Sequence, residues 1–209
     1  RNVNVTLNRT VTASIGILVA ASTTGGGATP TAATGNNNNN SVLNVTVQNA
    51  ANGILVISGT ATWPDINNIV GTTGGGTTTI GADYVGIPNG DIGGGTASNY
   101  GIQFSNQQDG RVFDCTVRNI ASSAGTNRGI YFLGARGTCE VNGNRVRGIR
   151  NTSTTSTATQ RGMDLAMSTT GTNNFRIYNN LISHITAAYT GAASGTRVIT
   201  GMILGSGSA

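Results

Sequence analysis

Few side chains in this sequence could carry out acid–base or nucleophilic chemistry. The 209 residues include seven acidic side chains, one histidine and two cysteines. Glycoside hydrolysis needs two carboxyl groups about 5 to 9.5 Å apart, facing one sugar bond. Asp83 and Asp91 could form such a pair only if the loop between them folds back. His184 forms no credible triad with an acid and a serine, and we expect it on an outer face.

The other reactive residues provide no second candidate for a catalytic site. When the repeats described below are aligned, Asp114 and Asp164 each stand alone, so no acidic column forms that would bind calcium. Cys115 and Cys139 lack the spacing of a metal or redox site. Cys139 aligns with Gly110, five positions before Cys115 in the repeat register, which is too far for a disulfide unless the chain bends between the two positions. We therefore predict no catalytic, cofactor-binding or metal-binding residues and no enzymatic activity.

The composition narrows the choice of partners. Charged residues make up 9% of the chain, the formal net charge is +5, and every basic side chain except His184 is an arginine. The sequence lacks basic residues interleaved with aromatic residues, the pattern that binds single-stranded nucleic acid, so we expect no nucleic-acid partner. No apolar run approaches the roughly 18 residues of a membrane helix, so we expect no membrane insertion. Nine of the twelve arginines lie between Arg111 and Arg176, which leaves a weak preference for anionic polysaccharide.

The same composition suggests where the protein works. Thr, Asn, Ser and Gly are abundant while Lys and Glu are scarce, as in many secreted surface proteins. The chain starts at Arg1 and shows no signal peptide, so we expect a processed or excised piece of a longer product. The expected location is extracellular or at the cell surface.

The second half of the chain repeats one unit. Segments 101–104, 129–132, 162–165 and 201–204 each begin with glycine and continue with Ile or Met, as in Gly101-Ile102-Gln103-Phe104. The first three are each followed by a nine-residue block of constant length. Self-similarity of this kind indicates a stack of equivalent units. Aligned, the blocks give three apolar columns: Val112, Val141 and Ile177; Val117, Val146 and Ile182; Ile120, Ile149 and Ile185.

The repeated unit is predicted to consist of strands. Its commonest residues are poor helix formers, and its apolar residues occur in short Val- and Ile-rich runs between turn residues. A coil of strands buries its inward side chains only when other coils lie above and below, about 4.8 Å away. We therefore predict an all-β fold, a parallel β-helix of about six coils with long loops at one corner and no capping helix. Residues 1–209 would form one domain, with irregular coils over 1–99, including a loop over 23–41, and regular coils over 100–209.

Two polar columns accompany the apolar ones. Asn144 and Asn180 align, with Cys115 at the preceding position, and stacked amides there would form a hydrogen-bonded ladder. The alternative is that these asparagines are ordinary turn residues. A charge ladder of alternating sign is expected from Arg111, Glu140 and Arg176.

Further arginines also align. The alignment stacks Arg118 on Arg147 and Arg128 on Arg161, in each case without a partner of opposite charge. The plainer alternative for all these charges is that they are solvated side chains on the outer face.

The first half follows the same pattern less regularly. Candidates for its inward residues are Ile80, Val85, Ile87 and Ile92. Trp63 would either cover a corner of a coil or serve as a platform on which a sugar stacks.

These features resemble a known family. The Gly-Ile-x-Phe strands, the Asn-rich corner and the block over 177–185 look like the right-handed parallel β-helix of the pectate-lyase-like superfamily. They are most similar to repeat regions of secreted surface proteins of Bacteroidetes-type bacteria. The lyase branch would imply calcium-binding acids with a catalytic Arg or Lys, and the polygalacturonase branch paired Asp motifs with Gly-His-Gly. This sequence has none of these motifs.

The ends of the repeat suggest a function. A β-helix normally covers its open ends, because an exposed edge pairs with any similar edge. The sequence shows no amphipathic cap at either end, so we expect either that the piece was cut from a longer solenoid or that its ends bind each other. The leading hypothesis is a structural solenoid, a filament subunit or surface stalk, with copies of itself bound head to tail. The alternative is a β-helix that binds or cleaves polysaccharide, with surface glycans as partners. The expected assembly ends are Val3, Val5 and Leu7, and Met202, Ile203 and Leu204.

Overall fold

The protein is built from short parallel β-strands. A computed structural model describes residues 2–11, 14–20, 36–59, 62–83, 91–94, 98–153, 158–188 and 199–206. In these residues every regular element is a strand, and every pairing between strands is parallel. Within the same ranges no helix has the length and apolar character needed to cross a bilayer. The prediction of an all-β chain with parallel pairing is thus confirmed.

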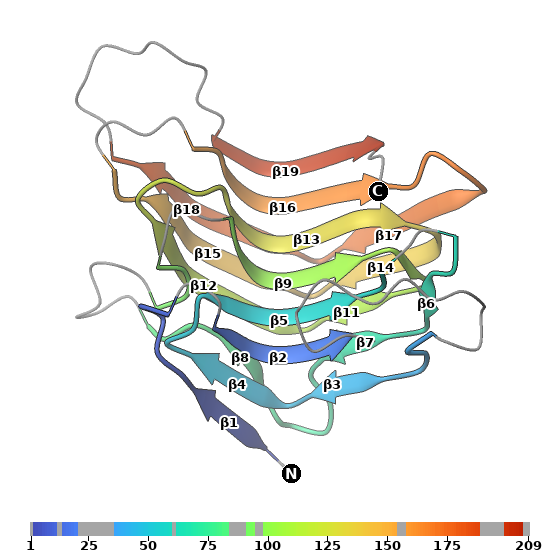
Figure 1. The fold of residues 1–209 in the computed structure, drawn as a ribbon, viewed down its shortest axis with the longest axis horizontal. Helices are drawn as coiled ribbons and strands as arrows, with labels where there is room; N and C mark the ends of the chain where they lie inside the picture. Colours follow the sequence, from blue (N-terminus) through green and yellow to red (C-terminus); the bar gives the residue numbers. More distant parts are fainter. Residues whose placement is uncertain are drawn as a thin grey trace.

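The strands form three long sheets and one short one (Figure 1). Sheet A contains β1 (Val3–Thr6), β4 (Val45–Gln48), β8 (Thr78–Ile80), β12 (Cys115–Ser122), β15 (Arg145–Asn151) and β18 (Leu181–Ala187). Sheet B contains β2 (Ile15–Ala20), β5 (Asn52–Ile57), β9 (Asn99–Ser105), β13 (Asn127–Ala135), β16 (Gln160–Met167) and β19 (Ile199–Ser206). Sheet C contains β3 (Ser41–Leu43), β7 (Ile69–Gly71), β11 (Arg111–Phe113), β14 (Gly137–Asn142) and β17 (Asn173–Tyr178). The short sheet D pairs β6 (Asp65–Ile66) with β10 (Gln107–Gln108).

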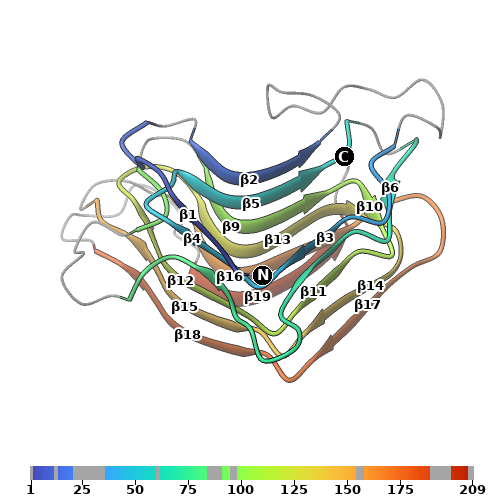
Figure 2. The same cartoon turned by 90° about the horizontal axis from the view of Figure 1, so that it is seen from below.

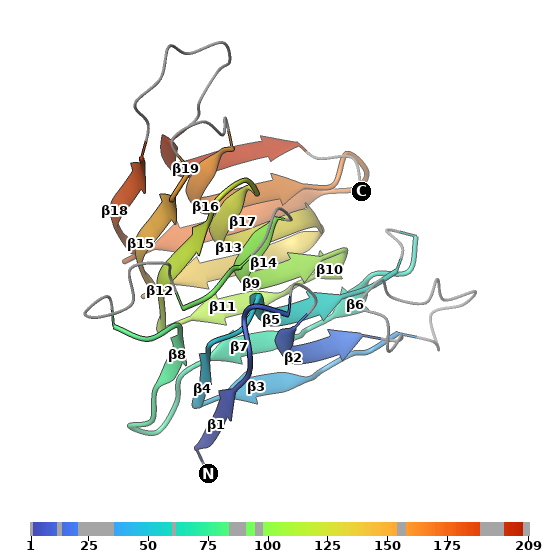
Figure 3. The same cartoon turned by 60° about the vertical axis from the view of Figure 1, so that its left-hand side comes forward.

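The chain visits the sheets in a fixed order. It runs from C to A to B and then starts again one strand further along each sheet, so each circuit is one turn of a stack (Figures 2 and 3). Sheets A and B have six strands each, which agrees with the expected number of about six coils. Every strand therefore pairs with its equivalent in the neighbouring turn.

Inward side chains from successive turns lie over one another in files, which we define as side chains at the same register position. The sheet register pairs Val112 with Val141 and then Ile177, Val117 with Val146 and then Ile182, and Ile120 with Ile149 and then Ile185. In the inner turns these residues are fully buried, whereas in the last turn they are only partly buried.

Aromatic rings pack against one another in the interior, between sheets B and C. Phe104 and Phe132 pair in sheet B with ring centroids 4.9 Å apart, and Phe175 of sheet C meets Phe132 edge to face at 5.4 Å. Such pairs add about 0.5–1.5 kcal/mol to the stabilisation from burial. The core is therefore continuous from sheet B across to sheet C.

The corner between sheets C and A is tight because it uses residues with positive φ. Asp114, Gly143 and Asn179 occupy this corner in three successive turns, with φ of 51°, 67° and 54°. Asn, Asp and Gly are the residues that adopt this left-handed conformation most readily. An ideal Cβ at Gly143 would lie 1.9 Å from Oδ1 of Asp114, so the carboxylate of one turn occupies the space above the glycine of the next.

The sequence predicts that the long connections lie at one corner, but they lie at two corners. Segments 81–98, 152–159 and 188–198 join sheet A to sheet B, whereas segments 21–40 and 58–68 join sheet B to sheet C. The corner between C and A is mostly shorter because its polar contacts fix its length. Of the expected inward residues, Ile80 and Ile92 are fully buried. Val85 and Ile87, and residues 23–35 of the predicted loop, lie outside the described residues.

Candidate functional site

The amide ladder occupies the corner where each turn enters sheet A. Nδ2 of Asn144 donates to Oδ1 of Asn180 at 3.0 Å and to the carbonyl of Val112 at 2.9 Å, and Oδ1 of Asn144 accepts from the backbone N–H of Cys115 at 3.0 Å. Asn180 repeats the pattern by donating to the carbonyl of Val141 at 2.8 Å. Asn144 is fully buried, so each of its polar atoms has a partner in the protein interior.

A second amide ladder lies at the start of sheet B, and sequence reasoning missed it. Nδ2 of Asn99 donates to Oδ1 of Asn127 at 2.9 Å, and Nδ2 of Asn127 donates to Oε1 of Gln160 at 2.8 Å. All three are buried and in register. Each stands two residues before the glycine that opens a repeat, and this constant offset could have revealed the ladder.

The charge ladder occupies the outer face of sheet C. The register places Arg111, Glu140 and Arg176 side by side in successive turns, and Nε of Arg111 lies 3.0 Å from Oε2 of Glu140. The other carboxylate oxygen accepts a hydrogen bond from the Tyr178 hydroxyl. This hydrogen bond to Glu140 raises the pKa of Tyr178, because it favours the protonated phenol.

Arg128 and Arg161 share a carboxylate, contrary to our expectation that they stack without a partner. Nε of Arg128 lies 2.6 Å from Oδ2 of Asp164, which also accepts from Arg161. The Arg128 guanidinium lies 4.4 Å from the ring centroid of Tyr131, which stacks on Tyr100. Asp164, expected to stand alone, is 5% exposed, and the two cations compensate the burial of its charge. Burial raises the pKa of Tyr131.

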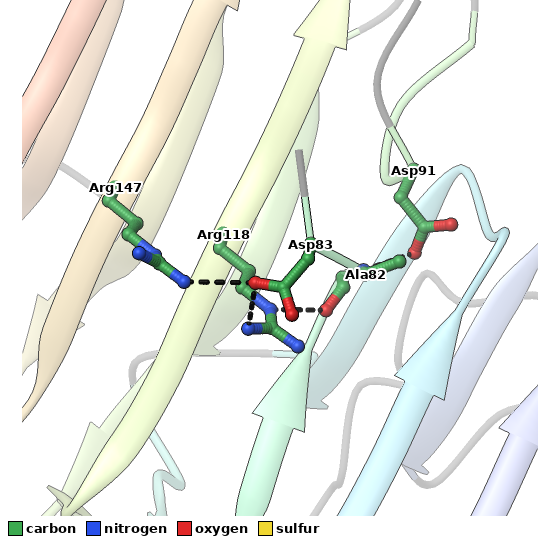
Figure 4. Close-up of polar contacts among 6 residues, drawn as sticks. Ala82, Asp83, Asp91, Arg118 and Arg147 are labelled. Carbon is green, nitrogen blue, oxygen red and sulfur yellow. Dashed lines mark hydrogen bonds and ion pairs between the residues drawn. The ribbon is translucent and has the colours of Figure 1, made fainter. Parts of the chain in front are cut away.

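Arg118 and Arg147 also share a carboxylate that the sequence did not assign to them. Oδ1 of Asp83 lies 2.5 Å from Nη1 of Arg118 and 3.0 Å from Nη2 of Arg147 (Figure 4). Asp91, the proposed second acid of a hydrolytic pair, is buried and accepts backbone hydrogen bonds from Asn49 and Ala82 at 3.0 and 2.8 Å. The two acids thus have separate partners, one on the surface and one inside.

A cavity of about 430 Å³ adjoins this arginine pair. Asp83, Arg118, Asn119, Arg147 and His184 contribute to its lining. His184 is exposed and has a φ of 54°, in the position that Asn119 and Gly148 hold in the two preceding turns. Its place on an outer face is the one that the sequence suggested.

The two cysteines are buried, whereas Trp63 is partly exposed at the surface. Cys115 and Cys139 are free thiols, both buried, and no disulfide joins them. Burial raises the pKa of both thiols, that of Cys139 to about 11. Trp63 is 38% exposed, and its backbone carbonyl accepts from the Ser58 hydroxyl at 3.1 Å.

In the described part of the chain, inward side chains of the last strand, β19, are exposed at the edge of the stack. Among the expected assembly ends, Met202 is 43% and Leu204 54% exposed, while Ile203 is half-buried. At the opposite edge, Val3 is 51% exposed, whereas Val5 and Leu7 pack partly against the core. Side chains with core-like character are thus accessible at both edges.

Comparison with protein-family models, curated proteins and solved structures found no match to this chain. Among the residues that the structure describes, no group of three or more His, Cys, Asp or Glu side chains is placed to hold a metal ion.

Proposed function

We propose that this chain is an extracellular or cell-surface structural solenoid whose copies stack head to tail into a filament or stalk. The observation that carries this proposal is that the same files reach both edges of the stack. Val5 and Ile182 belong to one file, whose pairings run through β1, β4, β8, β12, β15 and β18. Val19 and Leu204 end another file, which runs through sheet B.

Matching files favour one mode of contact. Strand β18 of one copy can continue onto β1 of the next, and β19 onto β2, with parallel direction and apolar files preserved. Contact between two identical edges would instead oppose the strand directions. Because the head-to-tail contact joins two different surfaces and does not close on itself, it extends indefinitely. Sheet C has five strands, so this contact leaves the place of one strand between β17 and β3.

We further propose that the stack of turns winds as a right-handed β-helix. Connections between parallel strands of one sheet are right-handed in about 98% of cases, which supports a right-handed β-helix resembling the pectate-lyase-like superfamily. The outer arginine pairs that share a carboxylate, such as Arg118 with Arg147, support a structural role, because the carboxylate cancels one of the two positive charges and so lowers repulsion of a neighbouring copy. The scarcity of Lys and Glu supports a place outside the cell.

The test compares two substitutions on one strand. Leu204→Lys places a charge in a file at the open edge, whereas Ile203→Lys places the same charge at the neighbouring position, beside Asp164 in the register. We expect the unmodified protein and Ile203→Lys to form concentration-dependent filaments in electron microscopy and sedimentation, and Leu204→Lys to stay monomeric. Monomers of the unmodified protein at the highest attainable concentration, or equal assembly of both variants, would refute the proposal.

A further inference from the structure

The cavity beside sheet A holds a buried amide that has no partner in the described protein. Asn119 is 1% exposed, and neither its Oδ1 nor its Nδ2 makes a hydrogen bond with the residues that the structure describes. A carboxamide left unpaired in a protein interior costs a few kcal/mol, so buried amides normally have a protein, water or ligand partner. Asn119 forms part of the cavity lining. A group bound in the cavity can therefore supply the missing partner.

Asn119 has this position because the strand is interrupted there. Its φ is 58°, and the register pairs Arg118 with Arg147 and Ile120 with Ile149 while omitting Asn119 and its equivalent, Gly148. The interruption puts the amide next to the arginine pair. A carboxamide both donates and accepts, as a hydroxyl group does, so the two groups are well matched.

The arginine pair next to the amide already holds a carboxylate. Asp83 approaches both guanidinium groups through a single oxygen, Oδ1, and its side chain is 64% exposed. Arg147 is 52% exposed and Arg118 is 20% exposed. Ion pairs with this degree of exposure are weak, so a competing carboxylate can replace Asp83. A carboxylate that uses both oxygens would bind the planar guanidinium groups better than Asp83 does.

We propose that this cavity binds a hydroxylated carboxylate such as a sugar acid, in competition with Asp83. Arg118 and Arg147 hold the carboxylate, and Asn119 exchanges hydrogen bonds with a neighbouring hydroxyl. His184 and Thr186 present polar groups on the same lining. A volume of about 430 Å³ lies in the range typical of small-ligand sites. The ligand can be a free acid or one unit of an acidic polysaccharide, since the recognised chemistry is the same.

Calorimetric titration with sodium glucuronate tests the proposal, with glucose and acetate as reference ligands. We expect saturable binding of glucuronate that is stronger than binding of either reference. Arg147→Gln should weaken glucuronate binding about tenfold or more, because it removes a charge-assisted contact. Asp83→Asn should strengthen it several-fold, because it removes the internal competitor. Arg176→Gln, on sheet C, is the matched control and should leave binding unchanged.

Asn119→Gly tests the hydroxyl contact separately. Glycine tolerates positive φ and already occupies the equivalent position at Gly148, so the variant should fold. Its glucuronate affinity should fall towards that of acetate; an unchanged ratio of the two would overturn the hydroxylated class. Absence of saturable binding in both the unmodified protein and Asp83→Asn, or weaker binding by Asp83→Asn, would overturn the site itself. A glucuronate oligomer that binds far more tightly than the monomer assigns the polymer as the source, and equal affinity per unit assigns the free acid.

Discussion

Replacing Asn144 by alanine should destabilise the protein strongly, because this side chain makes hydrogen bonds to both neighbouring turns. The change removes the partner of the buried Cys115 N–H, which costs about 1–3 kcal/mol. It also removes the two hydrogen bonds from Nδ2, to Asn180 and Val112, each worth about 1 kcal/mol net. The expected loss in free energy of unfolding is therefore about 3–5 kcal/mol.

Urea denaturation followed by circular dichroism measures this loss. The control is Asn142→Ala, which removes an asparagine two residues away whose Nδ2 makes an exposed contact with the Tyr178 hydroxyl at 3.2 Å. We expect the control to cost less than about 1 kcal/mol, as surface substitutions usually do. A loss below about 1 kcal/mol for Asn144→Ala, or losses of equal size for both variants, would show that the ladder contributes little to stability.

Three further predictions concern the corners and the buried titratable groups. Gly143→Ala should lower the free energy of unfolding by about 1–3 kcal/mol, because its backbone is left-handed. Any further loss from the clash with Asp114 should be partly recovered when Asp114 is also replaced by glycine. Equilibrium unfolding of the single and double variants measures both effects. Burial raises the pKa of the Cys115 and Cys139 thiols, so both should react with an alkylating reagent near pH 8 about a hundredfold or more slowly in the folded protein than in urea. Similar alkylation rates in the two conditions, measured by mass spectrometry, would contradict the burial of the thiols. Burial also raises the pKa of Asp65, so the folded protein keeps a proton that the unfolded chain releases as pH rises above the usual carboxyl range. The free energy of unfolding of Asp65→Asn should therefore increase relative to that of the unmodified protein between about pH 3 and 7. A difference in free energy of unfolding that stays constant over this range would rule out this titration.

The regular half of the fold could be predicted because its inward side chains recur at fixed distances within each turn. Val117, Val146 and Ile182 stand five residues after Val112, Val141 and Ile177, so aligning the blocks places both files in the register that the structure has. Constant length within a block reflects the tight corner between sheets C and A, where one inserted residue would move the next strand out of register. Alignment of the repeats therefore reveals the parts of each turn whose length cannot change.

The carboxylate partners of the arginine pairs could not be predicted in the same way. Asp83 lies 35 residues from Arg118 and 64 from Arg147, in a connection that is longer than its counterparts in other turns. Asp164 stands in a column with Gln103, Tyr131 and Ile203, none of them acidic, so nothing in the alignment marks this position as acidic. Such contacts depend on where an individual loop or side chain folds, and one sequence holds no repeated record of that.

The orientation of the backbone hydrogen bonds has a mechanical consequence. Each bond joins one turn to the next, so a force that pulls the first and last turns apart acts along the bonds and loads an edge first. Asn144 and Asn180 stand one turn and 36 residues apart, and a released length of that size extends to about 120 Å. Under tension the molecule would lengthen in discrete steps, with one circuit of chain peeling away while the circuits beneath it stay wound.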